Sequence, residues 1–293
     1  MTQEVQPDDA PRIVRTSHEN GHFYSPVVDP EELQAQQERL WPQQPQVLGV
    51  DFNDAEHERF LREAFARFIG DYDFPERLSE DACPLGFFTQ NSQFSWLDSR
   101  TYFVMLRELH PRRVIEIGGG YSTLLACDVN VRFLGGNARI SCVEPYPRDF
   151  LHNPALGLQL IEDKIQNVGA SLFDELAAGD VLFIDSSHVA KTGSDVNHIY
   201  FEILPRLRAG VVIHIHDIFL PHDYKKDWVL QENRSWNEQY VLRALLMYSA
   251  RFRVRFGCCY ALHRFPELLR TALAFADGRT FGGGSFWIET VAT

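Results

Sequence analysis

The stretch RRVIEIGGGYSTLL, residues 112–125, decides the fold because it joins a β-branched run directly to an apolar helical run. Three consecutive glycines at 118–120 stand at the join, where they permit positive φ angles and let a ligand approach the backbone. The dinucleotide fingerprint G-x-G-x-x-G is broken, since position 123 is threonine. Glu116 lies two residues before the glycines, where it would repel a diphosphate but accept a hydrogen bond from a cationic amine. The join therefore predicts a strand, a ligand-binding turn and a helix.

The composition is that of an ordinary globular protein, with 293 residues, 45% of them hydrophobic and 23% charged. No apolar run approaches the ~20 residues of a membrane span, and the polar, acidic start is unlike a signal peptide, so we expect a cytoplasmic protein. The formal charge of −12 disfavours nucleic acid and anionic membranes as partners and leaves a small molecule. Five cysteines without CxxC spacing favour buried thiols over a zinc site or disulfides.

Three regions follow from the pattern along the chain. Residues 1–50 are rich in Gln and Pro and predict a partly flexible arm, in which the segment GHFYSP at 21–26 is either a lid over a ligand or a strap packed on the core. Residues 51–99 predict a helical and irregular cap. Residues 100–293 predict one catalytic domain.

Cap signals mark the starts of three expected helices. The first carries a one-sided apolar face from residue 53 to residue 69, the second covers 98–109, and the third covers 235–249. The residues that would cap them are Asn53 with Glu56, Asp98 or Ser99, and Ser235 with Glu238.

From Arg113 onward, short β-branched runs alternate with helical segments. The runs lack alternating polarity, which is typical of parallel strands covered on both faces, and the alternation predicts right-handed βαβ units. We therefore expect an α/β fold with a doubly wound, mostly parallel, seven-stranded sheet. Its strands are expected in VIEIG (114–118), ISCVEP (140–145), LQLIED (158–163), DVLFIDSS (180–187), GVVIHIHDI (210–218), RFRVRFGCCYALHRF (251–265) and GGGSFWIETV (282–291).

A second carboxylate narrows the choice of ligand. Glu144 ends the second strand, where a carboxylate can accept both hydroxyls of a ribose. Together with Glu116 it describes a ligand that has a ribose and an ammonium group but no phosphate. A tight turn without any ligand is the alternative, and these two acids weigh against it.

The pattern E-x-G-x-G, followed by an acid that closes the second strand, resembles the class I S-adenosylmethionine-dependent methyltransferases over roughly residues 100–293. The resemblance implies a Rossmann-like fold and S-adenosylmethionine as the cofactor, with the glycine turn around its methionyl portion, the strand-two acid on the ribose and residues after strand three near adenine. The residues that it would assign to the cofactor are Glu116, Gly118, Gly119, Gly120, Tyr121, Ser122, Glu144, Pro145, Asp163, Lys164, Ile165, Asp185, Ser186 and His188.

Acids and imidazoles also end the fourth and fifth strands. The fourth ends at Asp185, with His188 three residues later, and the fifth ends with His216 and Asp217. This IDxxH and HD subset is similar to methyltransferases often found near sugar and natural-product pathways. Related catechol-type enzymes hold Mg²⁺ with acids at the ends of these two strands and have a carboxamide beside the second acid. The resemblance implies a divalent ion, Mg²⁺ or another, at Asp185, His216 and Asp217, with His188 as the base. Imidazole in place of a carboxamide beside the second acid leaves a softer metal, or none, open, while His214 is expected in the core.

The expected activity is methyl transfer to a small molecule, to a hydroxyl of a sugar or natural-product intermediate, with His188 and Asp217 as catalytic residues. Two alternatives remain open. The same fold could cyclise the aminobutyrate arm of the cofactor and release methylthioadenosine, or it could bind the cofactor without turnover. The loop at 220–240, with its tyrosines and tryptophans, is the expected acceptor pocket or else a solvated loop.

Overall fold

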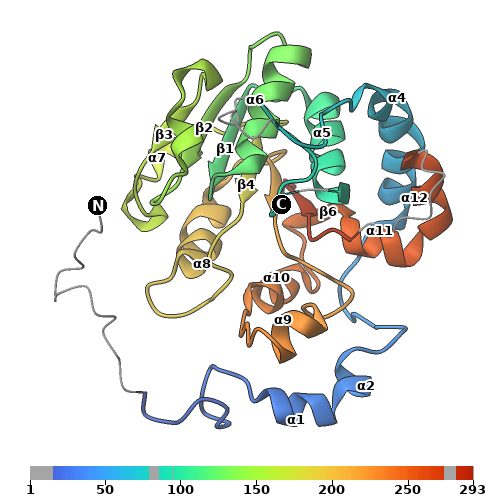
Figure 1. The fold of residues 1–293 in the computed structure, drawn as a ribbon, viewed down its shortest axis with the longest axis vertical. Helices are drawn as coiled ribbons and strands as arrows, with labels where there is room; N and C mark the ends of the chain where they lie inside the picture. Colours follow the sequence, from blue (N-terminus) through green and yellow to red (C-terminus); the bar gives the residue numbers. More distant parts are fainter. Residues whose placement is uncertain (1–15, 79–85, 95, 274–281, 293) are drawn as a thin grey trace.

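A seven-stranded sheet forms the centre of the computed structural model, which describes residues 16–78, 86–94, 96–273 and 282–292 (Figure 1). The strand order β3-β2-β1-β4-β5-β7-β6 reverses its direction of winding between β1 and β4. At such a switch point, ligands bind outside the carboxyl ends of the strands. The strands are β1 Arg113–Ile117, β2 Arg139–Val143, β3 Gln159–Ile161, β4 Val181–Ile184, β5 Val212–Ile215, β6 Phe252–Gly257 and β7 Phe286–Thr290.

The first five strands are parallel, and β7 runs antiparallel to both β5 and β6. Strands β4 and β5 are buried along their whole length, as expected where helices cover both faces of a parallel sheet. The predicted doubly wound, mostly parallel, seven-stranded α/β fold is therefore confirmed.

The segment 251–265 differs from its prediction as a single strand. Strand β6 ends at Gly257, and the helix α11 Cys258–Arg264 follows at once. Burial alternates along β6 and then changes to a spacing of three, with Cys258 and Ala261 buried on one helical face. The apolar composition is the same in both halves, so only the change of period distinguishes them.

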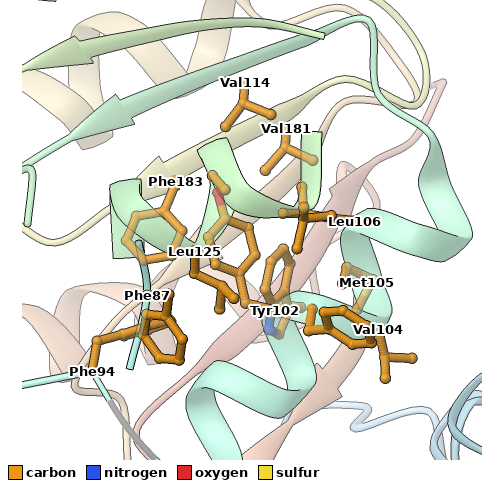
Figure 2. Packing of buried hydrophobic residues seen from close by; sticks show 14 of the residues in the cluster. Phe87, Phe94, Tyr102, Val104, Met105, Leu106, Val114, Leu125, Val181 and Phe183 are labelled. Carbon is orange, nitrogen blue, oxygen red and sulfur yellow. The ribbon is translucent and has the colours of Figure 1, made fainter. Parts of the chain in front are cut away.

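Two apolar clusters fill the layers on either side of the sheet. One cluster joins the sheet to α5 Trp96–Leu109, α6 Tyr121–Phe133, α11 and α12 Pro266–Leu273. Figure 2 shows part of it, with Tyr102 of α5 beside Phe183 of β4 and Phe94. The second cluster joins the opposite face to α7 Ser171–Asp174, to α8 Asp195–His198 with its continuation η7 Ile199–Ile203 and η8 Leu204–Arg206, and to α10 Glu238–Leu246.

Part of the segment before the sheet packs against the chain that follows β5. Val28, Leu33 and Trp41 contact the chain after β5, and Trp41 Nε1 donates to the Tyr224 carbonyl at 2.8 Å. The predicted helix from residue 53 to residue 69 is present, with a π-helical turn inside it. The segments are α1 Pro30–Ala35, α2 Gln37–Leu40, α3 Asp54–Arg59, η2 Phe60–Phe65, α4 Ala66–Phe68 and η3 Ile69–Asp71.

Asn53 is the N-cap residue of α3, as predicted, but its side chain makes no capping hydrogen bond, and the caps predicted at Asp98 or Ser99 and at Ser235 are wrong. The side chains of Asn53, Ser235 and Asp98 instead have partners distant in sequence. Asn53 Nδ2 donates to the Val254 carbonyl at 3.0 Å, and Ser235 Oγ accepts from Val28 N at 3.1 Å. Asp98 lies inside the first turn of α5, which begins two residues earlier. Tertiary contacts have replaced the local caps. The remaining short elements are η4 Asp149–His152, η5 Pro154–Leu156, η6 Ile165–Asn167 and α9 Lys226–Leu230.

Four of the five cysteines fall within the described residues, and all four are free thiols. Cys127, Cys142 and Cys258 are buried, as predicted, whereas Cys259 is only partly buried. Cys83 lies outside the described residues. In the part of the chain that the structure describes, no helix combines the length and apolar character that crossing a membrane requires.

Candidate active site

A cavity of about 980 Å³ lies at the carboxyl ends of β1, β2, β4 and β5. A second cavity of about 510 Å³ adjoins it, and the two share Gly118, Glu144 and Asp185 as walls. The predicted cofactor residues that line one or both cavities are Gly118, Gly119, Glu144, Pro145, Lys164, Ile165, Asp185, Ser186 and His188.

The glycine turn makes room for the strand ends around it. Gly118 has a φ of +86°, and a Cβ there would lie 1.9 Å from the Asp185 carbonyl oxygen. A Cβ on Gly119 would lie 2.3 Å from Cys142 Sγ, whereas one on Gly120 would meet nothing within 4 Å. Only the first two positions therefore require glycine on steric grounds.

Glu144 bridges the turn and the cavities. Its Oε2 accepts a hydrogen bond from Gly119 N at 3.0 Å, and its Oε1 accepts one from Tyr146 N at 2.8 Å. Each carboxylate oxygen has a further lone pair. The side chain is half-buried and lines both cavities, so this carboxylate is held by the backbone where a ligand can reach it.

Glu116 lies beneath the turn, and the described walls of the two cavities do not include it. It is fully buried, its Oε1 accepts from Ser122 Oγ, and its Oε2 has no hydrogen-bond partner in the described structure. Burial raises the pKa of this carboxyl to about 8, against the opposing effect of hydrogen bonds from Ser122 and Thr123. Its direct contact with a cofactor amine stays a prediction.

Four other predicted cofactor residues also lie away from the described cavity walls. Gly120 and Ser122 begin α6, and the Tyr121 ring packs against Phe150. Asp163 accepts hydrogen bonds within its own loop, from Lys164 N and Asn167 Nδ2, both at 2.7 Å. Their contacts shape the turn and the loop, and contact with a cofactor stays a prediction.

A buried pair of His188 and Glu238 stands at one side of the larger cavity. His188 Nδ1 donates to Glu238 Oε2 at 2.9 Å, and Ser186 Oγ donates to the same oxygen at 3.2 Å. Glu238 is fully buried at the start of α10, and His188 is 5% exposed. Because Nδ1 is engaged, the ring presents Nε2 toward Asp185 Oδ1 at 3.4 Å and Asp217 Oδ2 at 3.7 Å. The imidazole therefore has one anchored nitrogen and one nitrogen facing the site.

His216 completes the array from β5. Its Nδ1 lies 3.4 Å from Asp185 Oδ1 and 3.9 Å from Asp217 Oδ1, while its Nε2 lies 3.7 Å from Asp98 Oδ2. Asp98 also accepts from the backbone N–H groups of Gly284 at 3.1 Å and Ser285 at 2.7 Å. Two imidazoles thus alternate with three carboxylates in one buried cluster.

The charges in this array depend on one another. Burial disfavours both imidazolium ions, but the neighbouring carboxylates outweigh it, raising the pKa of His188 to about 10 and that of His216 well above its usual range. Burial would raise the pKa of Asp185, yet the two histidines hold it below its ordinary value. Burial raises the pKa of Asp217, which gains less from the histidines. The surrounding carboxylates therefore favour the cationic form of both imidazoles.

The predicted metal ligands Asp185, His216 and Asp217 lie together on the wall of the larger cavity. No group of three or more His, Cys, Asp and Glu side chains among the described residues could hold a metal ion as it stands. As the side chains stand, His216 Nδ1 is an ion-pair partner of Asp185 and Asp217. A divalent ion at Asp185, His216 and Asp217 stays a prediction, and the proposed role of His188 does not depend on it.

The sequence analysis does not predict three parts of the site. The local pattern predicts Asp98 and Glu238 only as helix caps, and it predicts the glycines at 282–284 only as the start of a strand. A Cβ on Gly284 would lie 2.9 Å from Asp217 Cα, so this run packs against the array. His214 is buried as predicted and stacks on Phe183 at 4.0 Å, although both its ring nitrogens lack hydrogen-bond partners within the described structure.

Comparison with known proteins matches residues 115–218 to the family model described as a methyltransferase domain. A protein of Archaeoglobus fulgidus, itself uncharacterized, is 34% identical over 161 residues, which cover 53% of this chain and 72% of that protein. The span matched by the family model, residues 115–218, includes the glycine turn, Glu144, Asp185, His188, His216 and Asp217.

Solved structures with similar folds have low identity to this chain. An O-methyltransferase from Bacillus cereus in complex with S-adenosylhomocysteine is 15% identical, covers 79% of this chain and 90% of its own, and has a TM-score of 0.40. A putative methyltransferase from Thermobifida fusca is 14% identical, with coverages of 66% and 79% and a TM-score of 0.44. The MycE methyltransferase of the mycinamycin pathway, in complex with Mg, S-adenosylhomocysteine and mycinamycin VI, is 16% identical, with coverages of 69% and 51% and a TM-score of 0.38.

The assignment rests on the matched domain and on the order of the strands around the glycine turn. The turn, the strand-two carboxylate and the acids of strands four and five all fall within or beside the matched span and meet at one edge of the sheet. Residues 115–218 therefore form a methyltransferase domain, set in a Rossmann-like, seven-stranded α/β fold.

Proposed function

We propose that this chain transfers the methyl group of S-adenosylmethionine to a hydroxyl oxygen of a small molecule, a sugar or natural-product intermediate, in the cytoplasm. The observation that carries the proposal is His188, anchored through Nδ1 by Glu238 and presenting Nε2 into a cavity that also contains Glu144 and the glycine turn. A positioned imidazole is suited to removing a hydroxyl proton near neutral pH.

The two cavities support a particular placement of the cofactor. Lone pairs of Glu144 would accept hydrogen bonds from the ribose hydroxyls, and the smaller cavity, with Lys164 and Ile165, would take adenine. The unpartnered Oε2 of Glu116 favours a cationic group near the turn. S-adenosylmethionine, when bound, supplies an electrophilic methyl carbon on a sulfonium.

The proposed roles of the remaining groups follow from their charges. A cationic ligand beside Asp185 would compete with His188 for that carboxylate and lower the pKa of the imidazole toward its neutral, basic form. Nε2 of His188 would then accept the proton of the acceptor hydroxyl as its oxygen attacks. Asp217, 3.7 Å from Nε2, would stabilise the imidazolium that forms.

The size of the larger cavity favours transfer over cyclisation. At about 980 Å³ it is at the upper end of small-molecule sites, which span ~300–1,000 Å³, and its walls are mostly polar. A cyclase needs a dry, closed space for a single molecule. This cavity has room for an acceptor beside the cofactor.

A single incubation tests the reaction class. With S-adenosylmethionine and a panel of hydroxylated acceptors, S-adenosylhomocysteine should form only when an acceptor is present, and mass spectrometry identifies it. Methylthioadenosine from enzyme and cofactor alone would point to cyclisation and refute the proposal. Glu144→Ala should weaken S-adenosylhomocysteine binding by ~1–3 kcal/mol in calorimetry, because the ribose hydroxyls lose their acceptor.

Variants of two histidines test the base. His188→Ala should lower transfer by ~10²–10⁴-fold while cofactor affinity is largely kept, as expected for the loss of a general base. His263→Ala is the matched control, because His263 is paired with His222 and is absent from the described walls of both cavities. Full activity in His188→Ala would contradict the role of this residue.

A further inference from the structure

One part of the wall of the larger cavity is basic and aromatic. Lys225, Trp228, Arg234 and Trp236, here called the basic–aromatic wall, lie on the segment that follows β5 and line the cavity. Arg234 Cζ lies 4.1 Å from the Trp228 ring centroid and 4.8 Å from that of Trp236. Lys225 Nζ lies 4.3 Å from the Trp228 centroid. Cation–π contacts thus hold both cations against indole faces.

These two cations are available to a ligand to different degrees. Arg234 forms an ion pair with Glu232 at 2.5 Å and keeps further N–H donors, since a guanidinium has five. Lys225 is exposed and, within the described residues, its ammonium has ring partners but no carboxylate partner. In a protein with a formal charge of −12, a cavity lysine without a carboxylate partner among the described residues is a specific local feature.

We propose that the acceptor carries an anionic group, a carboxylate or an equivalent oxyanion, which Lys225 and Arg234 bind while its hydroxyl lies at His188. This inference rests on the proposed function, because it concerns the same acceptor: the hydroxyl lies at His188, and the anionic group at the other end of the molecule binds Lys225 and Arg234. The indoles of Trp228 and Trp236 would hold the ring or chain that joins the two groups.

The distances along the wall set the length of this acceptor. The ring of Trp236 lies 4.3 Å from the ring of His188 between centroids, and Arg234 Cζ lies 4.8 Å from the same indole. The guanidinium is therefore no more than about 9 Å from the catalytic imidazole. This short spacing favours a compact acceptor, in which a single six-membered ring carries both the anion and the hydroxyl.

The anionic end of the cofactor has a separate cation. Arg148 lines the same cavity beside the glycine turn, with its Cζ 5.3 Å from the Tyr121 ring centroid, and its NH2 donates to Gln93 Oε1 at 2.9 Å. It has no carboxylate partner within the described residues. The carboxylate of the cofactor can therefore pair with Arg148, which leaves Lys225 and Arg234 to the acceptor.

Calorimetry or ligand-observed NMR on protein saturated with S-adenosylhomocysteine tests the inference. The probes are 4-hydroxybenzoate and its neutral methyl ester, compared in wild type, Lys225→Met/Arg234→Met and the control Lys226→Met. Lys226 is exposed, contacts Gln37 and is absent from the described cavity walls. Wild type and the control should bind the benzoate about tenfold or more tightly than the ester, because a charge-assisted hydrogen bond contributes ~1.5–3 kcal/mol.

The double variant should lose this preference and bind both probes alike. Equal binding of benzoate and ester to wild type, a preference that survives in the double variant, or no binding of the benzoate at up to about 50 mM would overturn the inference. Failure of S-adenosylhomocysteine itself to bind would instead refute the proposed function. Saturation with that product is measured first, so the two failures are distinguishable.

Discussion

Replacing Glu238 tests whether the orientation of His188 limits the reaction. Glu238→Ala removes the acceptor of the 2.9 Å bond from His188 Nδ1 and leaves a buried N–H without a partner. General-base catalysis contributes ~10²–10⁴-fold, and a freely rotating imidazole forfeits much of it. We expect a fall in kcat of ~10²–10³-fold, which corresponds to ~2.7–4 kcal/mol of transition-state stabilisation.

Glu238→Gln separates orientation from charge. The amide oxygen can still accept from Nδ1, so the ring keeps its direction and loses only the negative charge behind it. A fall of about tenfold is expected, with much of the rate lost in the alanine variant recovered. Cofactor affinity should change little in either variant, because Glu238 is absent from the described walls of both cavities.

The assay measures kcat and KM from S-adenosylhomocysteine formation, together with its binding constant and the midpoint of thermal unfolding. Glu267→Ala, at an exposed site on α12, serves as the control. Glu238→Ala with wild-type kcat would refute a positioning role. A parallel loss of cofactor binding and folding would show instead that Glu238 acts only in the structure of α10.

Three further predictions concern the turn, its acid and the metal. Gly118→Ala should abolish S-adenosylhomocysteine binding and lower the unfolding temperature, because its Cβ would meet the Asp185 carbonyl at 1.9 Å. Gly70→Ala is the control and should bind normally, because a Cβ at Gly70 would meet nothing within 4 Å. The raised pKa of Glu116, about 8 against an ordinary 4.5, means that the ligand-free native state binds one extra proton between these pH values. Stability should therefore fall as pH rises from 4.5 to 8, by about 1.4 kcal/mol per pH unit at most. Urea midpoints at about pH 6 and about pH 8 measure this, and an unchanged slope in Glu116→Gln would contradict it. If a divalent ion binds as predicted, Mn²⁺ added to the product complex should give a calorimetric signal that Asp185→Asn abolishes; no signal in wild type would exclude it.

The residues that sequence could locate share one property, which is their place at a strand end. Asp185, His188, His216 and Asp217 follow recognisable parallel strands, and parallel strands bring their carboxyl ends to one edge of the sheet. Their convergence in one cavity therefore follows from topology alone. The same rule predicts the place of Glu144, which follows β2 and lines the same cavity.

The missed residues have local patterns that fit another explanation equally well. Glu238 stands three residues after a serine, which is the spacing of a capping box, and only its bond to His188, 50 residues away, reveals its place in the site. Asp98 has the composition of a cap, but it accepts from Gly284 and Ser285 at the far end of the chain. Contacts of this range depend on how β7 enters the sheet, which no local pattern encodes.

Asp98 also determines when the site can assemble during synthesis of the chain. Its carboxylate joins the first turn of α5, which precedes β1, to the backbone that leads into β7, and it faces His216 on the intervening β5. A ribosome that has released the strands β1 to β5 has therefore exposed every predicted cofactor residue, but the carboxylate behind His216 still lacks its two backbone donors. Cofactor affinity should consequently appear on nascent chains before methyl transfer does, because the final strand β7 both enters the sheet between β5 and β6 and brings the backbone donors that fix Asp98 behind His216.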